Sequence, residues 1–263
     1  GVRDAECWEY GVAITERTAA VVYVAYPHTQ PKLEDVCTVA HDHGIPVLVD
    51  AAGQLPPESN LRRFISEGAD LVSFSGGKAI GGPQSSGFLC GRRDLIAAAA
   101  LQHLDLDILP ELWDPPSGLI DRSQLPGAPQ HGIGRPCKVG KEEIVGLLTA
   151  LRFFVEEDVI KRDQHWLELM NELVRACGEL SYTQIDIVSD KKRSSIPIVR
   201  LELDEAEAGI TAIELVRSLQ DGSPSIAANP SSVDEGIVIF GPTCLKKGEP
   251  TIIGNRLKEL LKN

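Results

Sequence analysis

A glycine-rich loop that carries one lysine follows a strand-like segment, and this combination constrains the fold more than any other stretch. Residues 69–75 (ADLVSFS) are typical of a buried strand, and residues 76–87 (GGKAIGGPQSSG) place Lys78 among glycines. Glycine lets the backbone approach a ligand closely and adopt conformations that other residues avoid. We therefore expect Lys78 either to hold a phosphate or to act as a nucleophile. The common phosphate loop is excluded, because Val72 and Ala79 stand where its motif requires Gly and Ser or Thr.

The segments around this loop alternate between strand and helix. Apolar runs predict strands at 21–26, 45–49, 69–75 and 86–90, and helical spacing predicts helices at 33–40, 61–67 and 93–103. The run at 21–26 is continuous, so burial on both faces is expected. This order predicts a mostly parallel α/β sheet, in which the carboxyl ends of the strands face a ligand crevice. Asp50 and Lys78 both follow strand ends, so we expect them to face that crevice.

The second half of the chain has a different pattern. Residues 105–137 are rich in Pro and Gly and are expected to form a long loop, which is uncommon unless it is functional or a linker. Amphipathic spacing and turn signals then predict helices at 139–157, 159–177, 211–220 and 249–261, and strands at 182–188, 196–203, 224–228 and 236–240. We therefore expect a large α/β domain over residues 1–138, and an interdomain helix with a smaller α+β domain over residues 139–263.

Composition narrows the classes of function. The formal net charge of −12 disfavours a broad nucleic-acid footprint. No apolar run reaches the roughly 18 residues of a membrane span, and six scattered cysteines without a C-x-x-C motif are typical of reduced thiols. His41 and His43 are two positions apart on a predicted helix, so they do not face each other, and no metal site is expected. These features predict a cytoplasmic protein without a metal.

Four motifs together resemble those of a known enzyme group. They are Asp-Ala-Ala at 50–52, Ser-Gly-Gly-Lys at 75–78, Gly-Gly-Pro-Gln-Ser-Ser-Gly at 81–87, and the stretch 134–148 (GRPCKVGKEEIVGLL). The chain thereby resembles the selenocysteine synthase-like group of fold-type I enzymes, which use pyridoxal 5′-phosphate (PLP). That group includes L-seryl-tRNA(Sec) selenium transferase and D-glucosaminate-6-phosphate ammonia-lyase. The resemblance covers most of the chain, is specific over 45–91 and 132–150, and weakens over 180–245.

The resemblance implies a fold and a gap. The implied fold is the aspartate aminotransferase-like one, with a large PLP-binding domain and a smaller C-terminal domain. In this group a glycine-rich loop early in the large domain holds the cofactor phosphate, and another residue stacks on its ring. Neither has a counterpart in this sequence, so the resemblance implies an N-terminally truncated chain. It also implies a homo-oligomer, because a neighbouring subunit usually completes such sites.

The resemblance assigns roles to five residues. Lys78 would form a Schiff base with PLP and then act as acid and base, Asp50 would pair with the pyridine nitrogen, and Ser75 would donate a hydrogen bond to the phosphate. Ala52 would pack under the ring, and Gln54 would touch the cofactor or structure the loop. The residues alone leave other interpretations open, with Lys78 as a surface lysine, Asp50 as a turn cap and Ala52 as a small turn residue.

Two further residues are candidates for substrate binding. Arg135 precedes the interdomain helix, and arginine matches carboxylates and phosphates bidentately. His28 follows the first strand and is expected near the crevice. For Arg135 a solvated role stays open, and for His28 a structural one. Gln84 is a candidate either to touch the cofactor or to shape the lysine loop.

The predicted function is that of a PLP-dependent lyase or transferase. It would act at Cα and Cβ of an amino acid or amino-sugar acid, by β-elimination or β-replacement. Selenium transfer on seryl-tRNA is one alternative, opposed by the acidic charge but with tRNA left open as a partner. A non-catalytic remnant of the fold is another. Ser75 and Lys78 also match the Ser-x-x-Lys of acyl enzymes, but the Ser-Asp-Asn and Lys-Thr-Gly motifs of that class do not occur.

Overall fold

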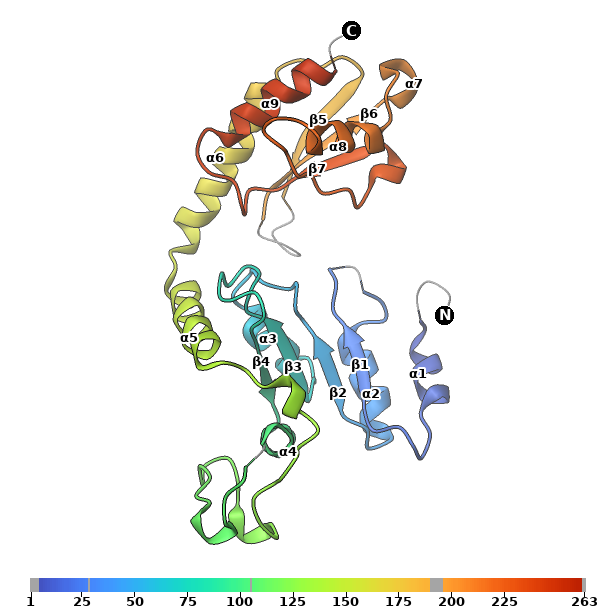
Figure 1. Cartoon of the computed structure of the whole chain (residues 1–263). Coiled ribbons are helices and arrows are strands. Elements are labelled where there is room, and N and C mark those ends of the chain that lie inside the picture. The colour runs from blue at the N-terminus through green and yellow to red at the C-terminus, as the bar shows by residue number, and fades with distance from the viewer. Residues whose placement is uncertain (1–4, 28, 105, 190–195, 262–263) are drawn as a thin grey trace. The chain divides into compact units, whose positions relative to one another are not determined.

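The computed structural model describes residues 5–27, 29–104, 106–189 and 196–261 (Figure 1). Its internal contacts divide the chain into two compact units, Gly1–Glu156 and Glu157–Asn263. The domain boundary expected between residues 138 and 139 stays a prediction. Within the described ranges, no helix combines the length and the apolar character needed to span a membrane.

A four-stranded sheet forms the centre of the first unit. Its strands are β1 (Val21–Val24), β2 (Val47–Asp50), β3 (Leu71–Ser75) and β4 (Gly87–Gly91), in the spatial order β1-β2-β3-β4. The first three strands are parallel, and β4 is antiparallel to β3. The predicted α/β architecture is therefore confirmed.

The first unit contains the four helices predicted near residues 33–40, 61–67, 93–103 and 139–157, and a further helix, α1 (Cys7–Ala13), that was not predicted. The four are α2 (Leu33–Asp42), α3 (Asn60–Ser66), α4 (Arg93–His103) and α5 (Lys141–Glu156). The chain turns sharply after α2 and α3 at Gly44 and Gly68, whose φ angles of +70° and +107° suit glycine. The long loop before α5 contains three short 3-10 turns, η1 (Pro110–Leu112), η2 (Arg122–Gln124) and η3 (Arg135–Cys137), and it buries Trp113 and Ile120.

The sheet of the first unit buries one face and leaves the other open. Val47 and Val49 of β2 are fully buried in a core shared with α2 and α3. On the opposite face, Val22 and Val24 of β1 are 59% and 44% exposed. The expectation that residues 21–26 are buried on both faces is therefore wrong. An apolar run favours burial, but covering a second face takes another layer of chain, which the described residues do not supply.

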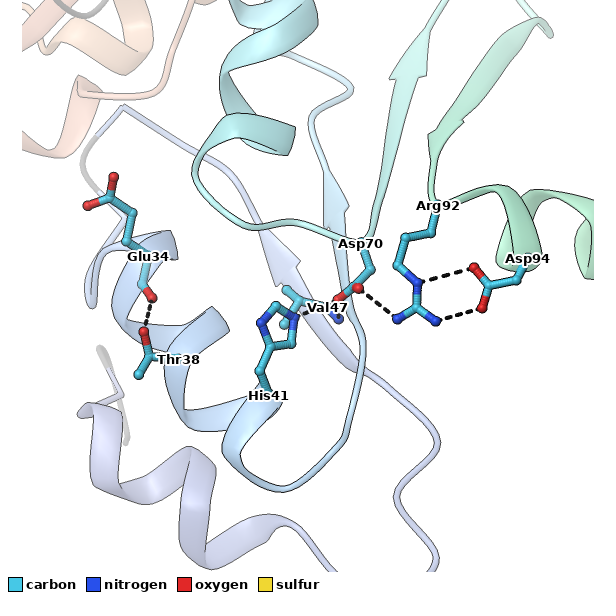
Figure 2. Close-up of polar contacts among 7 residues, drawn as sticks. All are labelled: Glu34, Thr38, His41, Val47, Asp70, Arg92 and Asp94. Atoms are coloured by element: carbon cyan, nitrogen blue, oxygen red, sulfur yellow. Dashed lines mark hydrogen bonds and ion pairs between the residues drawn. The ribbon is translucent and has the colours of Figure 1, made fainter.

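A buried carboxylate joins the elements where the strands begin, at what we call the amino edge of the sheet. The Asp70 side chain is 7% exposed and accepts a hydrogen bond from the backbone N–H of Val47 at 2.8 Å. It also pairs with His41 Nε2 at 2.8 Å and with Arg92 Nη1 at 2.9 Å (Figure 2). Arg92 in turn pairs with the exposed Asp94. Burial raises the pKa of the Asp70 carboxyl, but these hydrogen bonds outweigh burial and hold its pKa below the ordinary value.

The second unit is a small α+β arrangement, as predicted. Its strands are β5 (Thr183–Val188), β6 (Ile198–Leu203) and β7 (Ile237–Phe240), in an antiparallel sheet ordered β5-β6-β7. Its helices are α6 (Val159–Cys177), α7 (Glu205–Ala208), α8 (Ala212–Gln220) and α9 (Glu249–Leu260), with a 3-10 turn η4 (Val233–Glu235). Leu201, Leu215 and Leu257, from β6, α8 and α9, are fully buried in one core. The predicted capping box of Thr211 and Glu214 is confirmed.

One predicted strand of the second unit is wrong. Residues 224–228 form no strand, and the neighbouring Asn229 makes only an isolated bridge with Ile239. The backbone N–H of Ile226 instead donates to the carbonyl of Leu219 at 2.9 Å, in the last turn of α8. This segment therefore bonds back to a helix rather than to the sheet, although its Ile226 side chain is buried as an apolar run would predict.

Candidate active site

The carboxyl ends of β1, β2 and β3 meet at one edge of the sheet, which we call the carboxyl edge. The register pairs Val24 with Asp50, Asp50 with Ser73, and Ser73 with Leu89. Because side chains alternate between faces along a strand, these four residues form one row across the open face. A carboxylate and a hydroxyl thus stand side by side in the row between two apolar side chains.

Asp50 is the last residue of β2 and is half-buried. Its Oδ1 accepts a hydrogen bond from the backbone N–H of Ala52 at 3.0 Å, which fixes the turn that follows the strand. The turn-cap interpretation of Asp50 is thus met in the structure. A carboxylate has a second oxygen, and within the described part of the chain Oδ2 accepts no hydrogen bond. The cap therefore orients the carboxylate and leaves one oxygen for a ligand.

The lysine loop, residues 76–86, is tied together by its own backbone. The N–H of Gly76 donates to the Ser86 carbonyl, and the N–H of Gly82 donates to the Gly76 carbonyl, each at 2.8 Å. The N–H of Gly81 donates to the carbonyl of Lys78 at 2.9 Å. A Cβ on Gly77 would lie 2.5 Å from Gln84 Cα, so glycine is needed where the two arms of the loop pass each other. The loop is a closed structure that holds Lys78 in a defined place.

Lys78 itself is exposed, and its ammonium group has no ion pair or hydrogen bond with any described residue. It follows the end of β3 by three residues, and the end of β2, Asp50, belongs to the neighbouring parallel strand. The two candidate residues are thus brought to the same edge of the sheet from adjacent strands. Lys78 is an amine that the fold positions but does not use.

The other predicted cofactor residues lie at this edge as well. Ser75 ends β3 opposite Gly87 of β4 and is half-buried, as is Ala52 in the turn after β2. Gln54 is 9% exposed, and its backbone closes that turn by donating from its N–H to the Ala51 carbonyl at 3.0 Å. The carbonyl of Gln54 accepts from Asn60 Nδ2 at 2.6 Å, at the start of α3. Both contacts come from the backbone of Gln54, so the role of its side-chain amide stays a prediction.

Of the two predicted substrate-binding residues, only Arg135 lies among the residues that the structure describes. Arg135 is exposed, in η3, and its Nη1 lies 2.8 Å from His131 Nδ1. The N–H of Gly134 donates to the carbonyl of Gln102, which docks η3 on the end of α4. Figure 1 shows residues 106–137, in green, as the long connection between α4 and α5. His28 lies outside the described residues, so its expected place near the crevice stays a prediction.

Three features of this edge were missed in the sequence analysis. Ser73 shares the row of Asp50, and its hydroxyl donates weakly to the Val49 carbonyl at 3.4 Å. Ser86 closes the lysine loop, with its Oγ donating to the Pro83 carbonyl at 2.6 Å. Leu147 of α5, 8% exposed, packs with Ile80 of the loop. The alternation of strand residues could have revealed Ser73, but Ser86 and Leu147 are brought in only by tertiary contacts.

Comparison with known proteins shows what this chain is similar to. Residues 5–107 match the family model SelA, described as L-seryl-tRNA selenium transferase. A 5′-C-glycyluridine monooxygenase-decarboxylase from Streptomyces is 34% identical over 255 residues, covering 95% of this chain and 56% of that protein. D-glucosaminate-6-phosphate ammonia lyase from Salmonella typhimurium is 29% identical over 258 residues, covering 96% of this chain and 60% of that protein.

Solved structures agree. A structure of D-glucosaminate-6-phosphate ammonia-lyase aligns with a TM-score of 0.72 at 28% identity, over 100% of this chain and 62% of that one. This chain is similar to selenocysteine synthase-like, PLP-dependent enzymes. Ureidoglycine-glyoxylate aminotransferase from Bacillus subtilis aligns with a TM-score of 0.51 at 14% identity, which shows a shared fold. The predicted resemblance and fold are confirmed, and this selenocysteine synthase-like chain spans about three-fifths of the length of the relatives it matches.

Proposed function

We propose that this chain forms the major part of a PLP-dependent lyase or transferase that acts at Cα and Cβ of an amino acid or amino-sugar acid. One observation carries the proposal. The carboxyl edge combines an amine without a partner, on Lys78, with a carboxylate, on Asp50, that keeps one oxygen without a partner among the described residues. Among the described residues, the fold uses neither the ammonium group of Lys78 nor Oδ2 of Asp50.

The residues at this edge fit the three polar groups of PLP. An aldehyde, a pyridine nitrogen and a phosphate are complemented by an amine on Lys78, a carboxylate on Asp50 and a hydroxyl on Ser75, and the small Ala52 leaves room beside them. When bound, PLP supplies an electron sink for the bond that is broken at Cα.

Each residue would then have a defined task. Lys78 would hold the aldehyde carbon through its amine and, after the substrate amine replaces it, move a proton at Cα. Asp50 Oδ2 would accept a hydrogen bond from the protonated pyridine nitrogen and stabilise its charge. Ser75 would donate a hydrogen bond to the phosphate. The lysine loop, closed by its own hydrogen bonds, would keep the amine near the substrate.

The relatives support the substrate class. Their names refer to a glycyluridine, to D-glucosaminate 6-phosphate and to a seryl-tRNA. Each of these molecules carries an amino acid or amino-sugar acid moiety. We therefore propose a substrate of that chemistry for this chain, with elimination or replacement at Cβ as the reaction.

A homo-oligomer is part of the proposal. Arg135 is exposed in η3, which docks on the end of α4, and we propose that it contacts a substrate held at Lys78 of a second copy of the chain. Mixing Lys78→Ala copies with Arg135→Ala copies tests this directly. Activity above that of either variant alone supports a site shared between subunits, and no recovery removes Arg135 from the substrate site.

Two other functions remain as outcomes of the tests. Selenium transfer on seryl-tRNA is favoured by the match of residues 5–107, and a salt-sensitive shift of tRNA on a native gel would support it over the small-molecule proposal. A non-catalytic role is the other. It predicts no attachment of PLP at all.

The central experiment measures PLP attachment. Purified protein is titrated with PLP, reduced with borohydride and digested, and mass spectrometry locates the pyridoxyl group. We expect a visible absorbance band before reduction and a single modified peptide that contains Lys78. Lys78→Ala should lose both, whereas Lys247→Ala, which removes an exposed lysine of the second unit, should keep both. A band retained in Lys78→Ala, or labelling spread over surface lysines, would contradict the assignment.

A further inference from the structure

Helix α5 packs its inner face against the lysine loop. Leu147 and Phe154 of α5 form a small buried cluster with Ile80 of the loop, and Ala150 packs against it. A Cβ built on Gly82 would lie 3.4 Å from Leu147 Cα, so the backbone of the loop lies directly on the helix. The position of α5 therefore fixes one side of the loop.

The tightest approach is between Gly146 of α5 and Pro83 of the loop. A Cβ on Gly146 would lie 2.8 Å from Cγ and 3.1 Å from Cδ of Pro83. Side chains do not tolerate such a distance, and the proline ring cannot rotate away because it is closed onto the backbone. Alanine is the better helix former at an interior position. The close approach to Pro83 thus explains the glycine at position 146, whereas helix propensity would favour alanine there.

A shift of Pro83 would be transmitted toward Lys78. The Pro83 carbonyl accepts from the N–H of Ser86 at 3.1 Å and from its Oγ at 2.6 Å. The carbonyl of Ser86 accepts from the N–H of Gly76, two residues before the lysine. Two hydrogen-bonded steps therefore connect the α5 contact to the segment that carries the amine.

We propose that Gly146 is a positioning residue, which places Lys78 by letting α5 pack against Pro83. The proposed effect of Gly146 on the structure of the loop follows from the contacts alone. Its proposed effect on the chemistry rests on the function proposed above. No bond to a ligand is assigned to Gly146. Its role is to keep the lysine loop in the one conformation that its internal hydrogen bonds describe.

The first test measures amide hydrogen exchange over residues 76–86 in the full chain without PLP. Gly146→Ala should raise exchange there by roughly tenfold, because overpacking forces the backbone to shift. The double variant Gly146→Ala with Pro83→Ala should restore protection, because the new methyl group then takes the space that the proline ring leaves. Unchanged exchange in Gly146→Ala, or no recovery in the double variant, would overturn the proposal. If Gly146→Ala does not fold, Pro83→Ala alone decides, since loss of the ring contact should also raise exchange in the loop.

Two other helical glycines serve as matched controls. A Cβ on Gly11 of α1 would lie 3.5 Å from Val39 Cγ1, an ordinary contact, so Gly11→Ala should leave exchange in the lysine loop unchanged. A Cβ on Gly254 of α9 would lie 2.5 Å from Ala176 Cβ, so Gly254→Ala creates a clash in the second unit. If Gly254→Ala loosens the lysine loop as much as Gly146→Ala does, the effect is general destabilisation and the proposal is wrong.

The second test measures the rate at which PLP becomes attached to Lys78. A displacement of about 1 Å costs reacting groups on the order of a hundredfold in rate, so Gly146→Ala should slow attachment by up to that factor and the double variant should recover it. A normal rate in Gly146→Ala would contradict positioning of the amine. If the unmodified chain does not react with PLP, the proposed function fails, while the exchange experiment still decides the role of Gly146.

Discussion

Two aspartates stand at opposite edges of the same sheet and are treated differently by the fold. Asp70, just before β3, is buried and accepts hydrogen bonds from a backbone N–H, a histidine and an arginine. Asp50, at the end of β2, is half-buried, and one of its oxygens caps a turn. Its second oxygen has no partner among the described residues. The carboxylate at the amino edge is therefore fully paired, whereas the carboxylate at the carboxyl edge keeps one oxygen that no described residue pairs with.

The difference separates structural from functional carboxylates. A buried carboxylate whose oxygens are all paired stabilises the fold and has nothing left for a ligand. A carboxylate that is oriented by one hydrogen bond and otherwise free, beside an amine without a partner, is suited to bind one. We therefore expect changes at Asp70 to affect stability and changes at Asp50 to affect chemistry, and the following predictions test this division.

The largest effect is expected from Asp50→Asn on turnover. Asparagine keeps an oxygen for the N–H of Ala52, so the turn should survive. It removes the charge that would stabilise the pyridine nitrogen. A hydrogen bond to a charged group contributes about 1.5–3 kcal/mol, which corresponds to roughly a ten- to hundredfold loss in kcat. Steady-state kinetics and a denaturant melt on the same sample measure both properties, and unchanged kcat would remove Asp50 from the site.

The next effect is expected from Asp70→Asn on stability. It removes the charge paired with His41 and Arg92, and urea unfolding should show a loss of about 1–3 kcal/mol in the free energy of unfolding. Attachment of PLP to Lys78 should be unchanged under conditions where the protein is folded. Asp94→Asn, at the exposed partner of Arg92, should lower the free energy of unfolding much less, because water screens an exposed ion pair. If Asp70→Asn had normal stability but impaired PLP attachment, the assignment of Asp70 to stability and Asp50 to chemistry would be wrong.

The smallest effect is a dependence of stability on acid pH. Because the folded pKa of Asp70 lies below its ordinary value of 3.8, its stabilisation is fully present above about pH 3.8. It is lost as the pH falls below 3.8 through the folded pKa. The difference in unfolding free energy between the unmodified chain and Asp70→Asn should therefore shrink as the pH falls below 3.8. A difference that grows on acidification would show that Asp70 is not the stabilising charge.

Much of the site could be predicted from the sequence because it depends on local pattern. Apolar runs and helical spacing define the alternation of strands and helices, and strand ends at a parallel edge bring Asp50 and Lys78 to one place. The predicted strand at 224–228 failed because the same kind of apolar run can bond to a helix end. The burial expected for both faces of β1 failed because burial depends on what covers the strand.

The sequence by itself determined the order of the elements, the resemblance to PLP-dependent enzymes and the placement of a lysine and an aspartate after neighbouring strands. The tertiary structure decided which groups are already paired. It showed Asp70 saturated and Asp50 with one oxygen unpaired among the described residues, it docked the turn of Arg135 on the end of α4, and it brought Gly146 against Pro83. The physical reason is that periodicity follows from the local geometry of the backbone. Pairing and close approach depend on residues far apart in the chain, whose meeting no local pattern encodes.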